Sequence, residues 1–434
     1  MLPELITPVP GPKSAALADR LRQFECRNVT YLADDWPIFW KSAKGSNVWD
    51  VDGNRYLDLT SAFGVAGLGH RPEPVVNAML EQSQELLHAM GDVHPTELKV
   101  RLCEKLVAMT FERWGLGHAK VTLSNSGFEA VETALKTAFL ATGKPGVISF
   151  DGGYHGLGYG ALLAGSFPKF REPFEAQLSP ISHSLTFPRN ERELSELETQ
   201  LGELDPSTIG ALLIEPIQGR GGKVLPAERL HSFLREWCDE NAVILIHDEI
   251  YSGFQRTGKL FAGDHWGVRP DLICVGKAMS SGFPISACIG KSAVMDAWPL
   301  STGEAIHTST FLGHPVGCAM ALASLEALDH HAVSLAVEES GHAWVEALQG
   351  IDSHLIHEVR GKGLMIGVEL RHTDSRPAGD VAGQLLGELL AKGIIALADG
   401  PDGNVLAITP PFEFAKADRA HVVKTIGALL CRHH

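Results

Sequence analysis

The feature that most constrains the fold is a series of five short apolar runs that alternate with longer segments of helical spacing. Short apolar runs separated by helices are typical of an α/β domain whose strands are buried on both faces of a parallel sheet. The runs are Val121–Leu123, Val147–Phe150, Ala211–Ile214, Val243–Ile246 and Leu272–Val275. We therefore predict an α/β fold with a central, mostly parallel sheet.

A polar or glycine-containing segment follows each run, at the expected carboxyl end of its strand. Open α/β sheets bind ligands at those ends. The segments are Ser124–Gly127, Asp151–Gly156, Glu215–Pro216, Asp248–Glu249 and Gly276–Lys277. We expect them to line one binding site.

The flanking sequence predicts a smaller α+β domain built from both chain ends. Val48–Leu59 is expected to form a hairpin around Asp52–Gly53, and Val381–Lys392 an amphipathic helix. The Gly/Pro-rich segments 165–180 and 372–380 are expected to be surface loops. The predicted division is 1–65 and 321–434 for the smaller domain and 66–320 for the large one.

Size and charge exclude several classes of protein. The 434 residues are enough for a large core and a smaller domain, and the formal charge of −15 argues against nucleic-acid or membrane partners. No apolar run approaches the ~20 residues of a membrane helix, and residues 1–30 lack the apolar stretch of a secretory signal. Seven cysteines without a CxxC motif indicate free thiols rather than disulfides or a metal site. We expect a soluble, cytoplasmic chain.

The segment 124–136, SNSGFEAVETALK, has the features of an anion site. Ser126 precedes Glu129 by three residues, which is the spacing of a capping box at the start of a helix. A helix start after a glycine turn presents free backbone N–H groups and a partial positive charge to a phosphate. Alternatively, the box only caps the helix.

Lys277 lies directly after an apolar run in PDLICVGKAMSSGFP, 29 residues after Asp248 ends another run in VILIHDEIYSGFQRTG. Lysine is almost never buried without a specific reason. The alternative is a lysine that reaches the surface or pairs with a carboxylate.

Nine motifs, in order, resemble the class III (ornithine/GABA-type, omega) aminotransferases, which have the type I PLP-dependent transferase fold. The resemblance implies pyridoxal 5′-phosphate (PLP) as cofactor and ping-pong transfer of an amino group from an amine or amino acid to a 2-oxo acid. It also implies a homodimer. The motifs are DVDGNRYLDL, GLGH, SNSGFEAVETALK, DGGYHG, EPIQGRGG, HDEIYSGFQRTG, GKAMSSGFP, TFLGHP and VRGKGLMIGVEL.

The resemblance assigns catalytic and ring-binding roles. Lys277 would form a Schiff base with the cofactor and then act as the base that moves the substrate proton. Asp248 would keep the pyridine nitrogen protonated. Tyr154, with His155 beside it, would stack on one face of the ring, and Ile250 would pack on the other.

It also assigns the phosphate contacts. Gly127 and Phe128, next to Ser126, would donate backbone N–H groups, although many relatives have Ser or Thr in place of Phe128. Thr310 would reach the phosphate in the partner subunit. Glu215 would lie near the cofactor's 3′-oxygen. For Glu215, as for His155, a purely structural role in a buried polar network is an equal alternative.

The sequence departs from the family at the residues that read substrate carboxylates. Relatives have arginine where this chain has Leu157 and, three residues before the late Pro-Pro, Ala407. Arg220 replaces the family's glutamate after EPIQG. We hypothesise that Arg220 binds the substrate α-carboxylate; alternatively, it is a surface residue of a glycine-rich loop.

Two aromatic residues complete the expected substrate site. Phe63 matches a substrate-facing position near the entrance, and Trp36 lies where relatives often have pocket aromatics, although core packing is the more common role of a buried Trp. The missing arginines leave an amino-acid racemase or epimerase, or less readily a decarboxylase, as the rival function. A PLP-binding protein without activity is a further alternative, disfavoured by Lys277 and Asp248.

Overall fold

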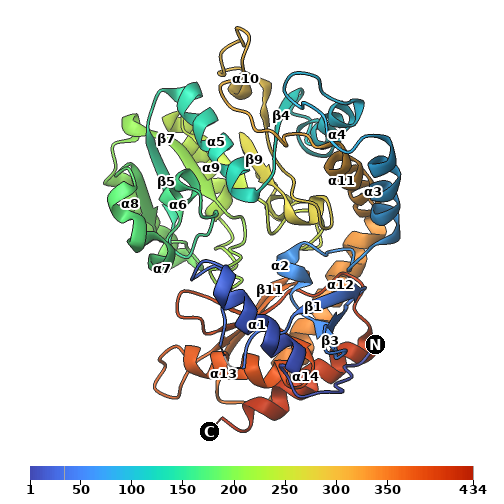
Figure 1. Cartoon of the computed structure of the whole chain (residues 1–434). Coiled ribbons are helices and arrows are strands. Elements are labelled where there is room, and N and C mark those ends of the chain that lie inside the picture. Colours follow the sequence, from blue (N-terminus) through green and yellow to red (C-terminus); the bar gives the residue numbers. More distant parts are fainter. Residues whose placement is uncertain (34, 434) are drawn as a thin grey trace. The chain divides into compact units, whose positions relative to one another are not determined.

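The computed structural model describes residues 1–33 and 35–433, which form two compact units. The larger unit is Glu73–Leu335, and the smaller combines Met1–Pro72 with Ala336–His434 (Figure 1). These limits differ from the expected division at 65/66 and 320/321. The second limit lies later than expected because helix α11 (Pro315–Leu328) lies wholly in the larger unit. Whether the chain forms separate domains with the expected limits remains a prediction. In the described part of the chain, no helix has both the length and the apolar character needed to cross a membrane.

The larger unit contains a seven-stranded sheet in the order β4-β10-β9-β8-β7-β5-β6. Only β10 runs antiparallel to its neighbours. All five apolar runs are strands, which confirms the predicted sheet. Its strands are β4 Ala119–Ser124, β5 Gly146–Phe150, β6 Ser182–Leu185, β7 Ile209–Ile214, β8 Ile244–Asp248, β9 Leu272–Val275 and β10 Ser286–Lys291.

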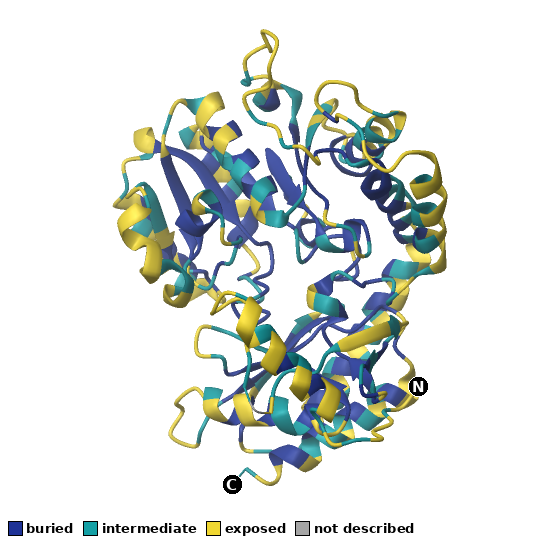
Figure 2. Ribbon diagram, viewed as in Figure 1, coloured by how far each residue is buried: buried dark blue, intermediate teal, exposed yellow. Residues whose placement is uncertain are grey.

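Helices cover both faces of this sheet, which is why its inner strands are mostly apolar. Ile148, Leu212 and Leu245 pack with residues of α8 and α9, whereas Ala211 and Ile246 pack with α5. Figure 2 shows the strands dark blue and the outer helix faces yellow. The helices of the unit are α3 Glu73–Glu85, α4 Glu97–Val107, α5 Gly127–Thr142, α6 Tyr159–Ala164, α7 Pro168–Arg171, α8 Glu191–Gly202, α9 Leu230–Asn241, α10 Ser292–Met295 and α11.

The prediction of a loop over 165–180 was wrong in part. Pro168 begins α7, and a 3₁₀ turn at Glu172–Gln177 follows. Proline at the first helical position lacks an N–H that would have no partner there, so it starts a helix as readily as it ends one. Phe167 and Phe170 of this segment pack edge-on against Tyr154.

The smaller unit joins both ends of the chain through the parallel pairing of β13 with β3. The antiparallel β2–β3 pair confirms the predicted hairpin, and α13 confirms the predicted helix, although it begins at Gly379, inside the expected loop 372–380. Two four-stranded sheets, β1-β2-β3-β13 and β11-β12-β15-β14, form the unit. Its strands are β1 Trp40–Lys44, β2 Asn47–Asp50, β3 Arg55–Asp58, β11 Ile356–Lys362, β12 Met365–Leu370, β13 Ile394–Ile395, β14 Leu397–Asp399 and β15 Val405–Ile408, and its helices are α1 Pro12–Phe24, α2 Ser61–Gly64, α13 Gly379–Leu390 and α14 Lys416–Leu430. Helix α12 (His331–Gln349) begins in the larger unit and continues into the smaller one from Ala336.

Candidate active site

The candidate site lies at the carboxyl edge of the large sheet. The strands β4, β5, β7, β8 and β9 point the same way, so their carboxyl ends share one edge. Asp248 is the last residue of β8, and Lys277 follows β9 after a single glycine. The segments predicted from the sequence therefore converge there.

Lys277 is partly buried and has a left-handed backbone, with φ of 44°. Its Nζ lies 5.0 Å from the centre of the Tyr251 ring. Among the described residues it forms no ion pair, which argues against both the surface and the paired alternatives. Burial lowers the pKa of Lys277, and the charges of Lys223 and Arg220 add to this effect against those of Asp248 and Glu215. A lowered pKa favours the neutral, nucleophilic amine.

Asp248 is held by two hydrogen bonds. The buried His155 donates from Nδ1 to Asp248 Oδ2 at 2.8 Å, and the Ile250 N–H donates to Oδ1 at 3.1 Å. Burial is the largest influence on the pKa of His155 and lowers it, but the hydrogen bond to Asp248 and the charges of Asp248 and Glu215 outweigh it, so the pKa is raised. The imidazole thus fixes the carboxylate orientation.

Glu215 ties two of the loops together. Its carboxylate accepts the Tyr154 N–H at 3.0 Å and the Gly219 N–H at 2.8 Å. The side chain is buried, and burial raises its pKa to about 7. These bonds are what a structural role requires, and a direct contact with the cofactor stays a prediction.

Helix α5 begins at Gly127 with Ser126 as its N-cap residue, as predicted, but the reciprocal capping box is absent. The Ser126 hydroxyl donates to Glu129 Oε2 at 2.9 Å, and the Asn125 N–H donates to the same oxygen at 2.9 Å. The capping-box prediction was wrong because Glu129 reaches one residue further back than such a box requires. The Ser126 side chain does not cap the first-turn N–H groups, which leaves a site suited to a phosphate.

Two glycines allow the loops to approach each other. A Cβ on Gly127 would lie 3.1 Å from two side-chain carbons of Ile250. A Cβ on Gly156 would lie 2.4 Å from Phe128 Cβ, and the φ of Gly156 is +114°. The start of α5 is thus packed against the segments after β5 and β8. The phosphate, ring and lysine positions assigned by the resemblance are consistent with this one cluster of loops.

Arg220 also belongs to this cluster. Its guanidinium carbon lies 4.8 Å from the centre of the Tyr154 ring and 5.2 Å from that of Phe170. Leu157, where relatives have arginine, is exposed. Arg220 is therefore more than a solvated surface residue, because it stacks on the aromatic expected to contact the cofactor.

The remaining predicted residues lie outside the cluster. Thr310 is exposed, although the neighbouring Ser309 accepts a hydrogen bond from Asn125 Nδ2 at 2.9 Å. Trp36 and Phe63 belong to the smaller unit. Trp36 packs on a core cluster with Tyr56, as its structural alternative requires, whereas Phe63 is 62% exposed. Roles for these residues in substrate binding stay predictions.

Sequence reasoning missed two residues, Lys223 and Tyr251. Lys223 is completely buried, and its Nζ lies 4.4 Å from the centre of the Tyr251 ring. A lysine in the glycine-rich loop GRGGK looks like a surface residue, and Tyr251 directly follows Ile250 in a motif assigned to other roles. The sequence indicated a role for them only through their neighbours, because Lys223 lies three residues after Arg220 and Tyr251 directly follows Ile250.

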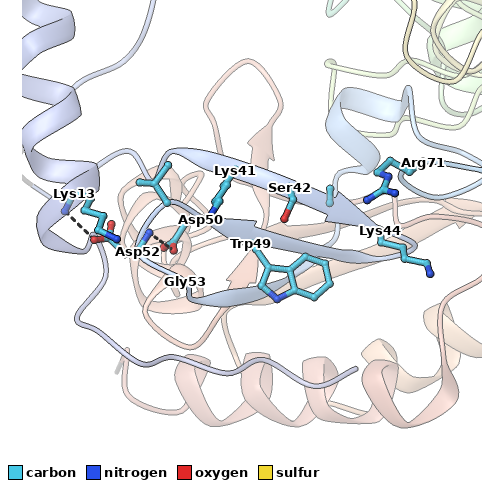
Figure 3. Close-up of a pocket in the computed structure, with 11 residues that line it drawn as sticks. Lys13, Lys41, Ser42, Lys44, Trp49, Asp50, Asp52, Gly53 and Arg71 are labelled. Carbon is cyan, nitrogen blue, oxygen red and sulfur yellow. Dashed lines mark hydrogen bonds between the residues drawn. The ribbon is translucent and has the colours of Figure 1, made fainter. Parts of the chain in front are cut away.

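The smaller unit contains a separate hollow of about 430 Å³ beside its β1–β2 hairpin (Figure 3). Lys13, Lys41, Lys44 and Arg71 give its lining a positive character. Asp52, also in the lining, accepts hydrogen bonds from the backbone of Lys13 and from Ser14. None of the residues predicted for cofactor or substrate lines this hollow.

Comparison with known proteins identifies the family. The model of the class III aminotransferases matches residues 31–430. This chain belongs to the class III aminotransferases. A 4-aminobutyrate aminotransferase of Mycobacterium leprae is 35% identical over 94% of this aminotransferase and 93% of the relative. An alanine/serine racemase of Pyrococcus horikoshii is 31% identical over 95% of the chain and 90% of the relative.

A solved structure agrees on both fold and cofactor. An amine transaminase from an uncultivated Pseudomonas species, solved with PLP bound, superposes with a TM-score of 0.86. It is 29% identical, and the match covers 94% of this aminotransferase and 98% of that chain. The predicted type I PLP-dependent fold is confirmed, and PLP is the cofactor.

Proposed function

We propose that this aminotransferase moves an amino group from an amine or amino acid to a 2-oxo acid by a ping-pong mechanism, with Lys277 as the residue that binds PLP. The observation that carries the proposal is the position of the partly buried Lys277 at the sheet edge that also holds Asp248, with no ion pair to any residue that the structure describes. Its lowered pKa supports a role as nucleophile and base.

The loops of the larger unit supply a partner for each part of the cofactor. The uncapped start of α5, with Ser126, Gly127 and Phe128, suits the phosphate. Tyr154 and Ile250 suit the two ring faces. When bound, PLP supplies an electrophilic carbon for the amine and a ring that accepts the electron pair left on the substrate Cα.

Each remaining step belongs to the protein's own side chains. The Lys277 amine, displaced by the substrate, takes up the proton that leaves Cα. The Asp248 carboxylate keeps the proton on the pyridine nitrogen, and His155 holds that carboxylate in orientation through the 2.8 Å bond. Glu215 fixes the backbone of Tyr154, so that the ring face is presented in a constant position.

Arg220 supplies the positive charge for a substrate carboxylate. Neither Leu157 nor Ala407 can replace the arginines of relatives, and the Arg220 guanidinium is already stacked on Tyr154 at 4.8 Å. A guanidinium held in one plane can bind a carboxylate through two parallel hydrogen bonds.

A homodimer with Thr310 at the partner's site is the proposed assembly. The support is an exposed apolar patch, formed by Leu86, Leu87, Met90, Val93, Ile306 and Phe311. Its two segments are joined by the bond from Thr308 to Asp92 and by the stacking of His88 on Phe311. Exposed apolar patches commonly mark protein interfaces. The seven free cysteines support a reducing, cytoplasmic location.

The reaction is tested by an absorbance titration of the holoenzyme with L-, D- and ω-amino compounds, in D₂O and without an oxo acid. Conversion of the cofactor to its pyridoxamine form, with release of the oxo product, is the expected result. Deuterium entry at Cα of an amino acid that keeps its nitrogen, without this conversion, would instead indicate racemase chemistry. That activity is named for the Pyrococcus relative.

Arg220→Ala tests the carboxylate site. KM for amino-acid and oxo-acid substrates should rise about 10- to 100-fold, because a charge-assisted bond contributes roughly 1.5–3 kcal/mol. Amines without a carboxylate should keep their KM. The matched control is Arg192→Ala, since Arg192 is an exposed arginine in α8. Equal kinetics of Arg220→Ala and the control on amino acids would refute the assignment.

A further inference from the structure

Lys223 is a fully buried lysine in the cluster of loops around Lys277. Its relative exposure is 0%, and its φ is 55°. Its Nζ donates to the Gly219 carbonyl at 3.2 Å and lies 3.4 Å from the Tyr251 hydroxyl. A lysine is rarely taken wholly out of water unless its charge has a use there.

Tyr251 connects this lysine to Lys277. The Nζ of Lys223 and the Nζ of Lys277 lie 4.4 Å and 5.0 Å from the centre of the same Tyr251 ring. Gly219 also packs close to the ring, since a Cβ added at this glycine would lie 3.4 Å from Tyr251 Cγ. The side-chain nitrogens of both lysines therefore contact the same aromatic ring.

We propose that Lys223 is a positioning residue for Lys277. Its ammonium group, fixed by the Gly219 carbonyl and the Tyr251 hydroxyl, holds the Tyr251 ring beside Lys277 and favours the uncharged Lys277 amine by like-charge repulsion.

The charged groups around Lys277 have opposing effects on the protonation of its amine. Asp248 and Glu215 favour the protonated amine, whereas burial, Lys223 and Arg220 favour the neutral one. Arg220 is also proposed to bind the substrate carboxylate, which would neutralise its effect whenever substrate is bound. Lys223 bonds to the Gly219 carbonyl and the Tyr251 hydroxyl and is not proposed to bind the substrate, so its charge acts whether or not a substrate is present. A second cation close to a lysine is an established way to activate it.

The test compares Lys223→Met with Lys223→Arg in the full-length protein. The readout is the rate at which the apo form captures added PLP as a function of pH, followed by absorbance and by borohydride reduction and mass spectrometry. Only the neutral Lys277 amine reacts, so the midpoint of the profile reports its ionisation. Thermal unfolding of each variant separates packing effects from charge effects.

Lys223→Met should raise the midpoint by about one pH unit, which is the order expected for one nearby charge in a partly buried site. Lys223→Arg should keep it close to the wild-type value. The control Lys120→Met, which removes one exposed lysine elsewhere in the larger unit, should leave it unchanged.

An unchanged midpoint in Lys223→Met, or equal shifts in the Met and Arg variants, would overturn the proposal and leave Lys223 a packing role. If Lys223→Met does not fold, Lys223→Gln provides the same comparison. The inference rests on the proposed role of Lys277, and Lys277→Ala distinguishes the two failures. If Lys277→Ala captures PLP at the wild-type rate, the role of Lys277 is refuted, whatever the result for Lys223.

Discussion

The hydrogen bond between Asp248 and His155 fixes the position of the Asp248 carboxylate in the site. The carboxylate ends a buried strand and would be costly to leave without partners. His155 and the Ile250 N–H satisfy one oxygen each, at 2.8 Å and 3.1 Å. Asp248 is therefore held in a fixed position, which a partner of a protonated pyridine nitrogen requires.

His231, by contrast, is a buried histidine whose titration bears on stability. Burial lowers its pKa to about 4, while its Nε2 bonds to the Pro216 carbonyl at 3.0 Å. Between pH about 6.5 and 4 the unfolded chain binds a proton that the folded chain does not. The stability from neutral His231 is therefore complete above about pH 6.5 and is lost as the pH falls toward 4.

His231→Gln should remove this dependence, because glutamine can still donate to the Pro216 carbonyl but does not titrate. On moving from pH 7 to pH 5, wild type should lose about 2 kcal/mol more unfolding free energy than the variant. Urea unfolding at the two pH values measures the difference. His118→Gln, at an exposed histidine, is the control. Parallel pH profiles for wild type and His231→Gln would contradict the prediction.

At the scale of elements, the approach of α5 to the loop after β5 depends on Gly156. Gly156→Ala should destabilise the protein by roughly 1–3 kcal/mol, because φ of +114° is strained for alanine and its Cβ would lie 2.4 Å from Phe128 Cβ. Affinity for PLP should fall as well, since Tyr154 and His155 directly precede this glycine. Denaturant unfolding and fluorescence titration with PLP measure the two effects.

Two comparisons isolate the clash. Gly202→Ala, at the end of α8, meets open space and should change stability by less than about 1 kcal/mol in either direction. Adding Phe128→Gly, which removes the Cβ involved in the clash, to Gly156→Ala should recover part of the PLP affinity. Equal stability of Gly156→Ala and wild type would show that the backbone tolerates the side chain.

The elements that could be predicted from the sequence are those with a strong local signal. Strand β7 is apolar throughout and β8 begins with an apolar run, because helices cover both faces of the sheet. Asp248 and Lys277 could be predicted as site residues because each lies at the end of such a run. Strand β6, with the sequence SHSL, has no such signal and was missed. Tertiary packing brings Lys223 beside Tyr251, 28 positions further along the chain, so the pair could not be predicted.

At the scale of the whole molecule, the exposed apolar patch predicts the assembly. Phe311→Asp should convert a dimer into monomers, because it places a charge within an apolar surface that includes Leu87 and Met90. Sedimentation velocity measures the change, and activity should fall with it if Thr310 completes the partner's site. Phe139→Asp, on the exposed face of α5, is the control. A wild-type protein that sediments as a monomer would refute the proposed dimer.

Borohydride reduction of the holoenzyme followed by peptide mass spectrometry shows whether Lys277 is the residue that binds PLP. We expect one phosphopyridoxyl group per chain, on the peptide that contains Lys277, and none in Lys277→Ala. Attachment to Lys223, or to no lysine at all, would contradict it.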